Sequence, residues 1–234
     1  MAEYSGDKVD INAQYNLAEP NSIPIKIAAR QRRKMFAIFL SETGIQQQDT
    51  VLEHGATSNQ TYSHSNYFEL WYPYKNRITA SGIDNAKFLE ELYPGLRFVP
   101  VDGRNLPFAD REFDFVHSSA VLEHVGSREK QVAFLREVWR VARKGIFVTT
   151  PNRWFPIEVH TMMPFIHWLP IAAFQKLCKM RGLDFFAYED NLSLLSVSKL
   201  RRLAEDAGLE NYKVIRVKLA GWTSNLLLSA TRAK

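Results

Sequence analysis

Two patterns of apolar and polar positions follow one another repeatedly along this chain, one typical of strands and the other typical of helices. Short apolar runs that end in a polar residue or a glycine are typical of buried strands, whereas longer stretches with an apolar position every three or four residues are typical of amphipathic helices. Strand patterns lie at residues 51–52, 77–83, 96–101, 113–117, 146–150, 212–219 and 225–230. Helix patterns lie at 23–43, 85–92, 127–144 and 198–207.

Two of the predicted helices have clear end signals. In the first, an apolar face is formed by Ile27, Met35, Phe36, Phe39 and Leu40, and Gly44 is the expected stop. In the third, Ser127 is the expected N-cap, and Gly145 is predicted to be a left-handed stop after the basic residues 143–144.

Strands that alternate with helices predict an α/β fold with a doubly wound, mostly parallel sheet. We expect an N-terminal arm and helix at residues 1–47 and a single α/β domain at 48–234. A long insertion at about 152–196 follows the fifth strand, and it is rich in proline and aromatic residues. Because it is too apolar to be disordered, we interpret it as a lid over a binding site.

Composition narrows the possible functions. The chain has 234 residues, one cysteine and a formal net charge of +5. One cysteine excludes an internal disulfide framework and, without a secretory signal, favours a cytoplasmic protein. The apolar stretch 162–174 is too short to span a membrane. The basic residues at 30–34 are interpreted first as the solvated side of a helix, so no nucleic-acid partner is expected; a peripheral membrane contact and a homodimer stay open.

The residues at the strand ends carry the candidate chemistry. They are acids and hydroxyls: Glu53, Asp84, Asp102 and the pair Ser118-Ser119. Ligands of parallel sheets bind at the carboxyl ends of the strands. A carboxylate after the second strand suits a ribose diol, and one after the third suits an adenine amine. Because the loop after the first strand lacks the G-x-G-x-x-G phosphate pattern, S-adenosylmethionine (SAM) is a better candidate than a dinucleotide.

Several segments resemble a known family. The runs at 101–108, 113–116 and 121–125, with the later Glu137-Val138-Trp139-Arg140-Val141, are similar to class I SAM-dependent methyltransferases, in particular the type 11 methyltransferase domain. The resemblance covers about residues 48–232. It implies a Rossmann-like sheet of seven strands with the last strand antiparallel, and SAM as the methyl donor with S-adenosylhomocysteine (SAH) as the product.

The resemblance also implies positions for the cofactor. The methionine end is expected at Glu53, Gly55, Ala56 and Thr57, with Ser118 and Ser119 lining the same side; the ribose at Asp84; and the adenine at Asp102 with the turn residue Gly103. The family's first motif is normally rich in glycine, whereas this chain has Gly55-Ala56-Thr57-Ser58-Asn59. Side-chain donors from Thr57, Ser58 or Asn59 are therefore expected to replace bare backbone in this loop.

Two histidines are candidates for the acceptor side. His124 is predicted either to act as a general base or to hydrogen bond a backbone carbonyl. His160 is predicted to line the acceptor pocket or to accept a proton. Metal binding by His160, His167 and Glu158 is not expected, because these residues lack a tightly spaced histidine pair.

The sequence supports two functions of different classes. The first is methyl transfer from SAM to an oxygen or nitrogen of a small-molecule, glycan-precursor or lipid-precursor acceptor. The alternative is a binding or scaffold protein on the same fold, with a degraded cofactor loop and a working surface on the helix that carries Arg30–Lys34. A nicotinamide dehydrogenase ranks third because the phosphate-binding loop is missing.

Overall fold

Seven strands form one sheet in the computed structural model, which describes residues 19–20, 22–62, 64–101, 105–158, 160–188 and 191–233. The order across the sheet is β3-β2-β1-β4-β5-β7-β6. Among these strands β7 alone runs antiparallel to the other six. The strands are β1 (Val51–His54), β2 (Ile78–Gly82), β3 (Arg97–Pro100), β4 (Phe113–Ser119), β5 (Ala142–Pro151), β6 (Tyr212–Leu219) and β7 (Trp222–Thr231). The predicted fold class and the antiparallel last strand are confirmed.

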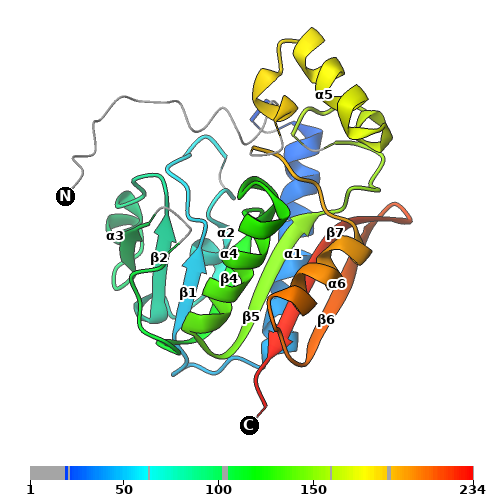
Figure 1. Cartoon of the computed structure of the whole chain (residues 1–234). Coiled ribbons are helices and arrows are strands. Elements are labelled where there is room, and N and C mark those ends of the chain that lie inside the picture. Colours follow the sequence, from blue (N-terminus) through cyan, green and yellow to red (C-terminus); the bar gives the residue numbers. More distant parts are fainter. Residues whose placement is uncertain are drawn as a thin grey trace, which may run out of the picture.

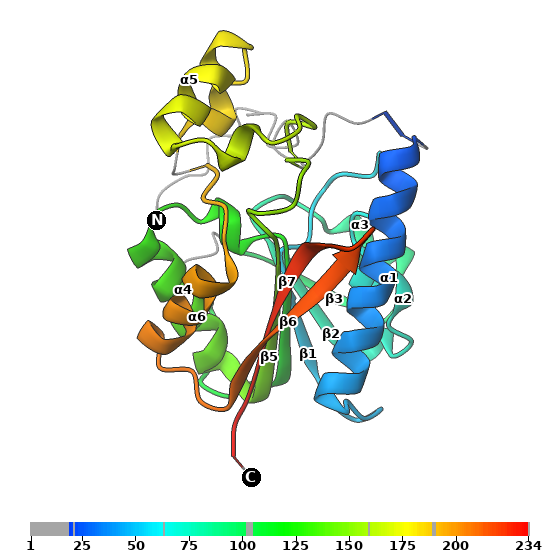
Figure 2. The same ribbon diagram turned by 90° about the vertical axis from the view of Figure 1, so that its right-hand side faces the viewer.

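Helices cover both faces of the sheet (Figures 1 and 2). One face carries α1 (Ile23–Thr43), α2 (Tyr67–Trp71) and α3 (Phe88–Leu92), and the other carries α4 (Arg128–Val141) and α6 (Val197–Asp206). Successive strand residues point to opposite faces. Val51 therefore joins the core under α1 and α2, whereas Leu52 joins the core under α4. None of the helices in the described part of the chain combines the length and the apolar character needed to cross a membrane.

Helix α1 ends as the sequence predicts. Gly44 has a left-handed φ of 56°, and its backbone N–H donates to the Leu40 carbonyl. The buried face is narrower than predicted: Met35 and Phe39 are buried, but Ile27 and Leu40 are each 38% exposed. The basic cluster is partly used in packing, because Arg33 lies over the ring of Trp71 at 4.6 Å.

The junction between α4 and β5 differs from the prediction. Helix α4 ends at Val141 and β5 begins at the next residue, so Gly145 is not a helix stop but a residue of the strand. A Cβ atom at Gly145 would lie 2.6 Å from the Ala230 carbonyl oxygen of β7. Glycine is required here because the backbones of two paired strands approach closely, not because the chain turns.

The described parts of the insertion, residues 152–158, 160–188 and 191–196, lie over the carboxyl ends of the parallel strands and include α5 (Ile171–Met180) (Figures 1 and 2). This segment, which we call the lid, has a small core of its own, made of Phe174, Cys178, Phe186, Ala187, Leu192 and Leu194. Its single-turn 3-10 helices are η4 (Ile166–Trp168) and η5 (Asp184–Ala187). Outside the lid, η2 (Lys75–Arg77) precedes β2 and η3 (Leu122–His124) follows β4.

Candidate functional site

The loop after β1 is held against the end of β2 by backbone hydrogen bonds. The N–H groups of Gly55 and Ala56 both donate to the Ser81 carbonyl, at 2.8 and 2.9 Å. Gly55 has a φ of 129°, and a Cβ atom there would lie 2.4 Å from the Val121 side chain. The single glycine of this loop is therefore needed for close packing of the chain itself as well as for its backbone conformation.

Asp84 lies just beyond β2, where it accepts hydrogen bonds from the polar loop. The hydroxyls of Thr57 and Ser58 each donate to Asp84 Oδ2 over 3.3 Å. Asn66 fixes the same loop, because its amide accepts from the Thr57 N–H and donates to the Thr57 carbonyl, both at 2.9 Å. The polar side chains of this loop thus hold the predicted ribose-binding acid in place.

Glu53 points toward the α1 and α2 side of the sheet. It is paired in register with His117 of β4, and Glu53 Oε1 lies 3.4 Å from His117 Nδ1. His117 Nε2 in turn lies 3.2 Å from the Tyr67 hydroxyl. Burial raises the pKa of Glu53 to about 8 and lowers the pKa of His117 to about 3, so both groups are neutral near pH 7.

The end of β4 adds two hydroxyls to the same edge of the sheet. Ser119 Oγ lies 2.9 Å from Thr149 Oγ1 of β5. Ser118 Oγ and Glu53 Oε2 are buried, and neither has a hydrogen-bond partner among the residues that the structure describes. Such atoms are rare in proteins without a ligand or water to complete them. The predicted adenine acid Asp102 and its neighbour Gly103 lie outside the described residues.

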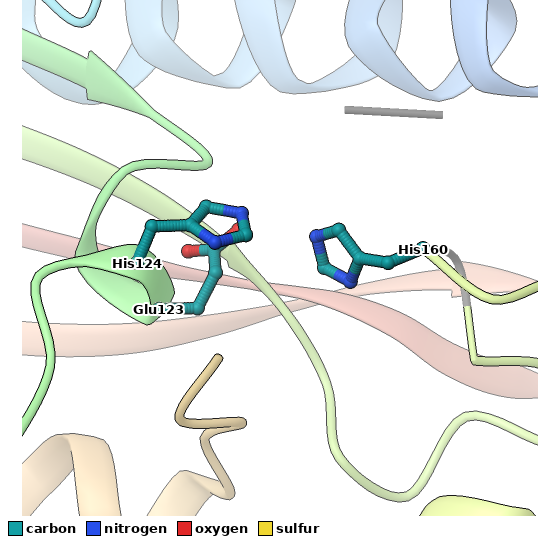
Figure 3. Close-up of side chains that lie close together, drawn as sticks. All are labelled: Glu123, His124 and His160. Atoms are coloured by element: carbon teal, nitrogen blue, oxygen red, sulfur yellow. The ribbon is translucent and has the colours of Figure 1, made fainter. Parts of the chain in front are cut away.

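A second group of side chains lies between the turn after β4 and the lid. Glu123 and His124 come from η3, and His160 comes from the lid; the three side chains converge (Figure 3). The rings of His124 and His160 are 4.9 Å apart between centroids, at an interplanar angle of 90°. The sequence separates the two histidines by more than thirty residues, and the lid brings them together.

Each histidine of this group has a fixed partner on its Nδ1 atom. His124 Nδ1 lies 2.7 Å from the Asn191 carbonyl oxygen, which is the second role predicted for that residue. His160 Nδ1 lies 2.7 Å from Glu158 Oε1, and the backbone N–H groups of His160 and Thr161 also donate to the Glu158 carboxylate.

Burial and charge set the protonation of these groups. Burial lowers the pKa of His124 to about 3 and raises the pKa of Glu123 to about 7. Burial alone would lower the pKa of His160, but the Glu158 carboxylate raises it above its ordinary value. His124 is therefore neutral near pH 7.

Comparisons with known proteins place this edge of the sheet in a functional context. Residues 66–149 match the family model described as a methyltransferase domain. That segment is a little over a third of the chain, and the sheet has the fold seen in SAM-dependent methyltransferases. The search of curated proteins found no match.

Solved structures of similar fold include enzymes with different acceptors. The magnesium protoporphyrin IX methyltransferase of Synechocystis PCC 6803, solved with bound SAH, is 16% identical, with a TM-score of 0.57 over 90% of this chain and 86% of that one. A SAM-dependent methyltransferase from Aquifex aeolicus is also 16% identical, with a TM-score of 0.56 over 90% and 99%. The phosphoethanolamine N-methyltransferase 2 of Haemonchus contortus, in complex with SAM, is 9% identical, with a TM-score of 0.57 over 86% and 53%.

The residues at the strand ends fit SAM chemically. A carboxylate and a hydroxyl with unused hydrogen-bonding atoms, Glu53 and Ser118, suit the amino-acid end, and Asp84 suits a diol. The sequence did not single out Glu123, although it is a carboxyl between apolar neighbours in the segment Val121-Leu122-Glu123-His124-Val125. A carboxyl within such an apolar segment is the one sequence signal that could have indicated a functional role for Glu123.

Proposed function

We propose that this protein is a SAM-dependent methyltransferase, which moves the methyl group of SAM to an oxygen or nitrogen of an amphipathic small molecule, a glycan precursor or a lipid precursor. The observation that carries this proposal is the position of the lid over the strand ends. SAM supplies a methyl group on a sulfonium, which is already a good leaving group. The protein must then bind, align and shield the two reactants.

The cofactor contacts follow from the strand ends. We place the ribose diol at Asp84 and the amino-acid end at Glu53, Gly55, Ala56, Thr57, Ser118 and Ser119. Glu53 is neutral in the free protein near pH 7, and a bound ammonium group would favour its ionised form. The Thr57 and Ser58 hydroxyls engage only Oδ2 of Asp84 in the described contacts, so the second oxygen is the expected site of the diol.

The acceptor chemistry is argued from the surface of the lid. Its exposed side chains include large apolar ones: Trp154, Ile157, Phe165, Leu169, Ile171, Met180 and Tyr188. Trp168 lies within 6.3 Å, between ring centroids, of Trp154, Phe165 and Trp222. An apolar and aromatic surface of this kind suits an acceptor with a hydrophobic body.

One cavity lies between the end of β5 and the lid, and a second lies between the lid and α6. One is lined by Pro151, Asn152, Phe155, Ile157, Glu158, His167 and Leu194. The other has Arg153 and Lys199 in its wall beside Phe174 and Leu192. Apolar walls with two cationic side chains favour an acceptor that carries an anionic group next to its hydrophobic part.

Calorimetric titration with SAH tests the cofactor assignment. Asp84→Ala removes a charge-assisted contact worth about 1.5–3 kcal/mol, so SAH affinity is expected to fall by about 10- to 100-fold. Asp110→Ala is the control, because that side chain is 77% exposed and pairs with Arg140 away from the strand ends. Equal affinity in the Asp84→Ala and Asp110→Ala variants would contradict the assignment.

Transfer of labelled methyl from SAM tests the acceptor class. We expect activity with amphipathic anionic acceptors and little with the same headgroup lacking its apolar part. The opposite order of activities would refute the interpretation of the lid.

A further inference from the structure

The cluster formed by Glu123, His124 and His160 has the composition of a metal-binding site. One nitrogen or oxygen atom from each of the three residues lies within 4.8 Å of the others. In Figure 3 the imidazole rings of His124 and His160 are directed toward each other, and the Glu123 carboxyl lies beside the His124 ring. Two imidazoles and one carboxylate form a common ligand set for catalytic zinc and for non-haem iron.

The partners of the two histidines orient them as ligands. A carbonyl oxygen can only accept a hydrogen bond, so His124 carries its proton on Nδ1, where it donates to Asn191. In the neutral ring, Nε2 is then the nitrogen without a proton. His160 likewise bonds to the Glu158 carboxylate through Nδ1, at 2.7 Å. Carbonyl and carboxylate partners on the remote ring nitrogen are the usual outer contacts of metal-bound histidines.

The third residue supplies an independent indication. Glu123 is fully buried, and neither of its carboxylate oxygens has a hydrogen-bond partner within the described part of the chain. Burying a carboxyl without a partner is costly, and the cost is normally offset by a hydrogen bond, a counter-ion or a metal. Around this carboxyl lie the Thr150 hydroxyl and two histidines whose Nδ1 atoms already have partners. A cation held jointly by Glu123 and the two rings would complete the group.

We propose that Glu123, His124 and His160 bind one divalent transition-metal ion, with Zn²⁺ as the first candidate. Imidazole ligands favour zinc, iron or nickel over magnesium and calcium, which prefer oxygen ligands. Ligand atoms around tetrahedral zinc, at about 2.0–2.1 Å from the ion, lie about 3.4 Å apart. Starting from separations of up to 4.8 Å, side-chain adjustments on the order of 1 Å close the site. Three protein ligands leave a fourth position open.

The open position lies on the acceptor side of the molecule. Glu123 and His124 follow the end of β4 by a few residues, and His160 belongs to the lid. Resting on the proposed function, we place an acceptor hydroxyl at this position, where the ion would lower the pKa of the hydroxyl. The hydroxyl proton passes to water, the oxygen forms the bond to the methyl carbon, and the carbon–sulfur bond breaks with its electron pair left on sulfur.

Metal binding can be measured without either substrate. Untagged protein freed of metal with a chelator is titrated with Zn²⁺ by calorimetry, and Co²⁺ is added separately to record its visible absorption. We expect one Zn²⁺ per chain and a Co²⁺ spectrum of tetrahedral type. Glu123→Gln should weaken Zn²⁺ binding by at least 100-fold, and Glu158→Gln, which removes the charge behind His160, by about 10- to 100-fold. His64→Gln, outside the cluster, is the control.

The outcomes separate this proposal from the proposed function. The metal site is overturned if the parent protein fails to bind Zn²⁺ stoichiometrically, or if Glu123→Gln binds it as tightly as His64→Gln. A circular dichroism spectrum like that of the parent shows that each variant folds. SAH titration of the metal-free protein reports on the cofactor site by itself. If metal binds but methyl transfer is the same with and without chelator, the acceptor role is wrong while the metal site stands.

Discussion

Replacing Glu53 tests how a buried carboxyl with a raised pKa affects the stability of this fold. The residue is 5% exposed, and its side chain faces His117, with Tyr67 and the buried Glu69 nearby. Replacing it by glutamine keeps the shape and removes the ionisable group. Because burial raises the pKa of Glu53 from 4.5 to about 8, the folded protein keeps a proton that the unfolded chain has lost over this range of pH.

The size of the effect on the free energy of unfolding follows from the difference between the two pKa values of Glu53. Where the folded state binds more protons than the unfolded state, stability falls as the pH rises. The loss contributed by Glu53 is absent below about pH 4.5 and complete above about pH 8. At about 1.4 kcal/mol for each pKa unit, it reaches on the order of 3 kcal/mol at pH 7 and 4–5 kcal/mol above pH 8. Glu53→Gln carries no such penalty, so we expect it to be the more stable protein at neutral and alkaline pH.

Urea unfolding at pH 5, 6, 7, 8 and 9, followed by tryptophan fluorescence, measures this difference. The buried carboxyl Glu123 affects both proteins alike and cancels in the subtraction. The charge of Glu53 helps to raise the pKa of Glu69, so the difference reports Glu53 together with its effect on Glu69. The difference in free energy of unfolding should grow with pH up to about pH 8 and then level off. Glu91→Gln at an exposed position is the control. Parallel stability curves for the parent and Glu53→Gln would refute the reasoning.

Two further substitutions test the sheet. Gly145→Ala should lower the free energy of unfolding by about 1–3 kcal/mol, because the new Cβ would lie 2.6 Å from the Ala230 carbonyl oxygen; an unchanged urea midpoint would count against this packing. Burial opposes ionisation of Asp114, but the Thr50 N–H and the Lys144 ammonium group lower its pKa on balance. Asp114→Asn should therefore cost about 1 kcal/mol at pH 7, and the cost should shrink as the pH falls through the lowered pKa. A cost that does not change in acid urea titrations would contradict this account.

The sequence was sufficient wherever local signals decide structure. Helix α1 and its Gly44 stop are determined by periodicity and by one left-handed residue, and both were predicted. Gly145 was misjudged because a glycine after a helix usually ends it, whereas here the constraint comes from β7, more than eighty residues later in the chain. No local pattern contains that contact.

In the candidate site, too, some features follow from local sequence and others from contacts between distant parts of the chain. The position of Asp84 after β2 was predictable from strand order. The orientation of Glu53 toward His117 depends on the register between β1 and β4, which the sequence does not state directly. The meeting of His124 with His160 depends on the path of the lid. Spacing rules for metal ligands consider residues that are close in sequence, so they missed a cluster assembled by tertiary structure.

The packing of α1 has a consequence for synthesis on the ribosome. Helix α1 rests against strands made much later: Gln31 and Lys34 both donate to the Lys218 carbonyl, and α1 contacts β5, β6 and β7. At translation rates of about 5–20 residues per second, its apolar stripe waits on the order of ten to thirty seconds for those strands. A nascent chain of this protein is therefore expected to need shielding by a chaperone until β6 and β7 have left the ribosome.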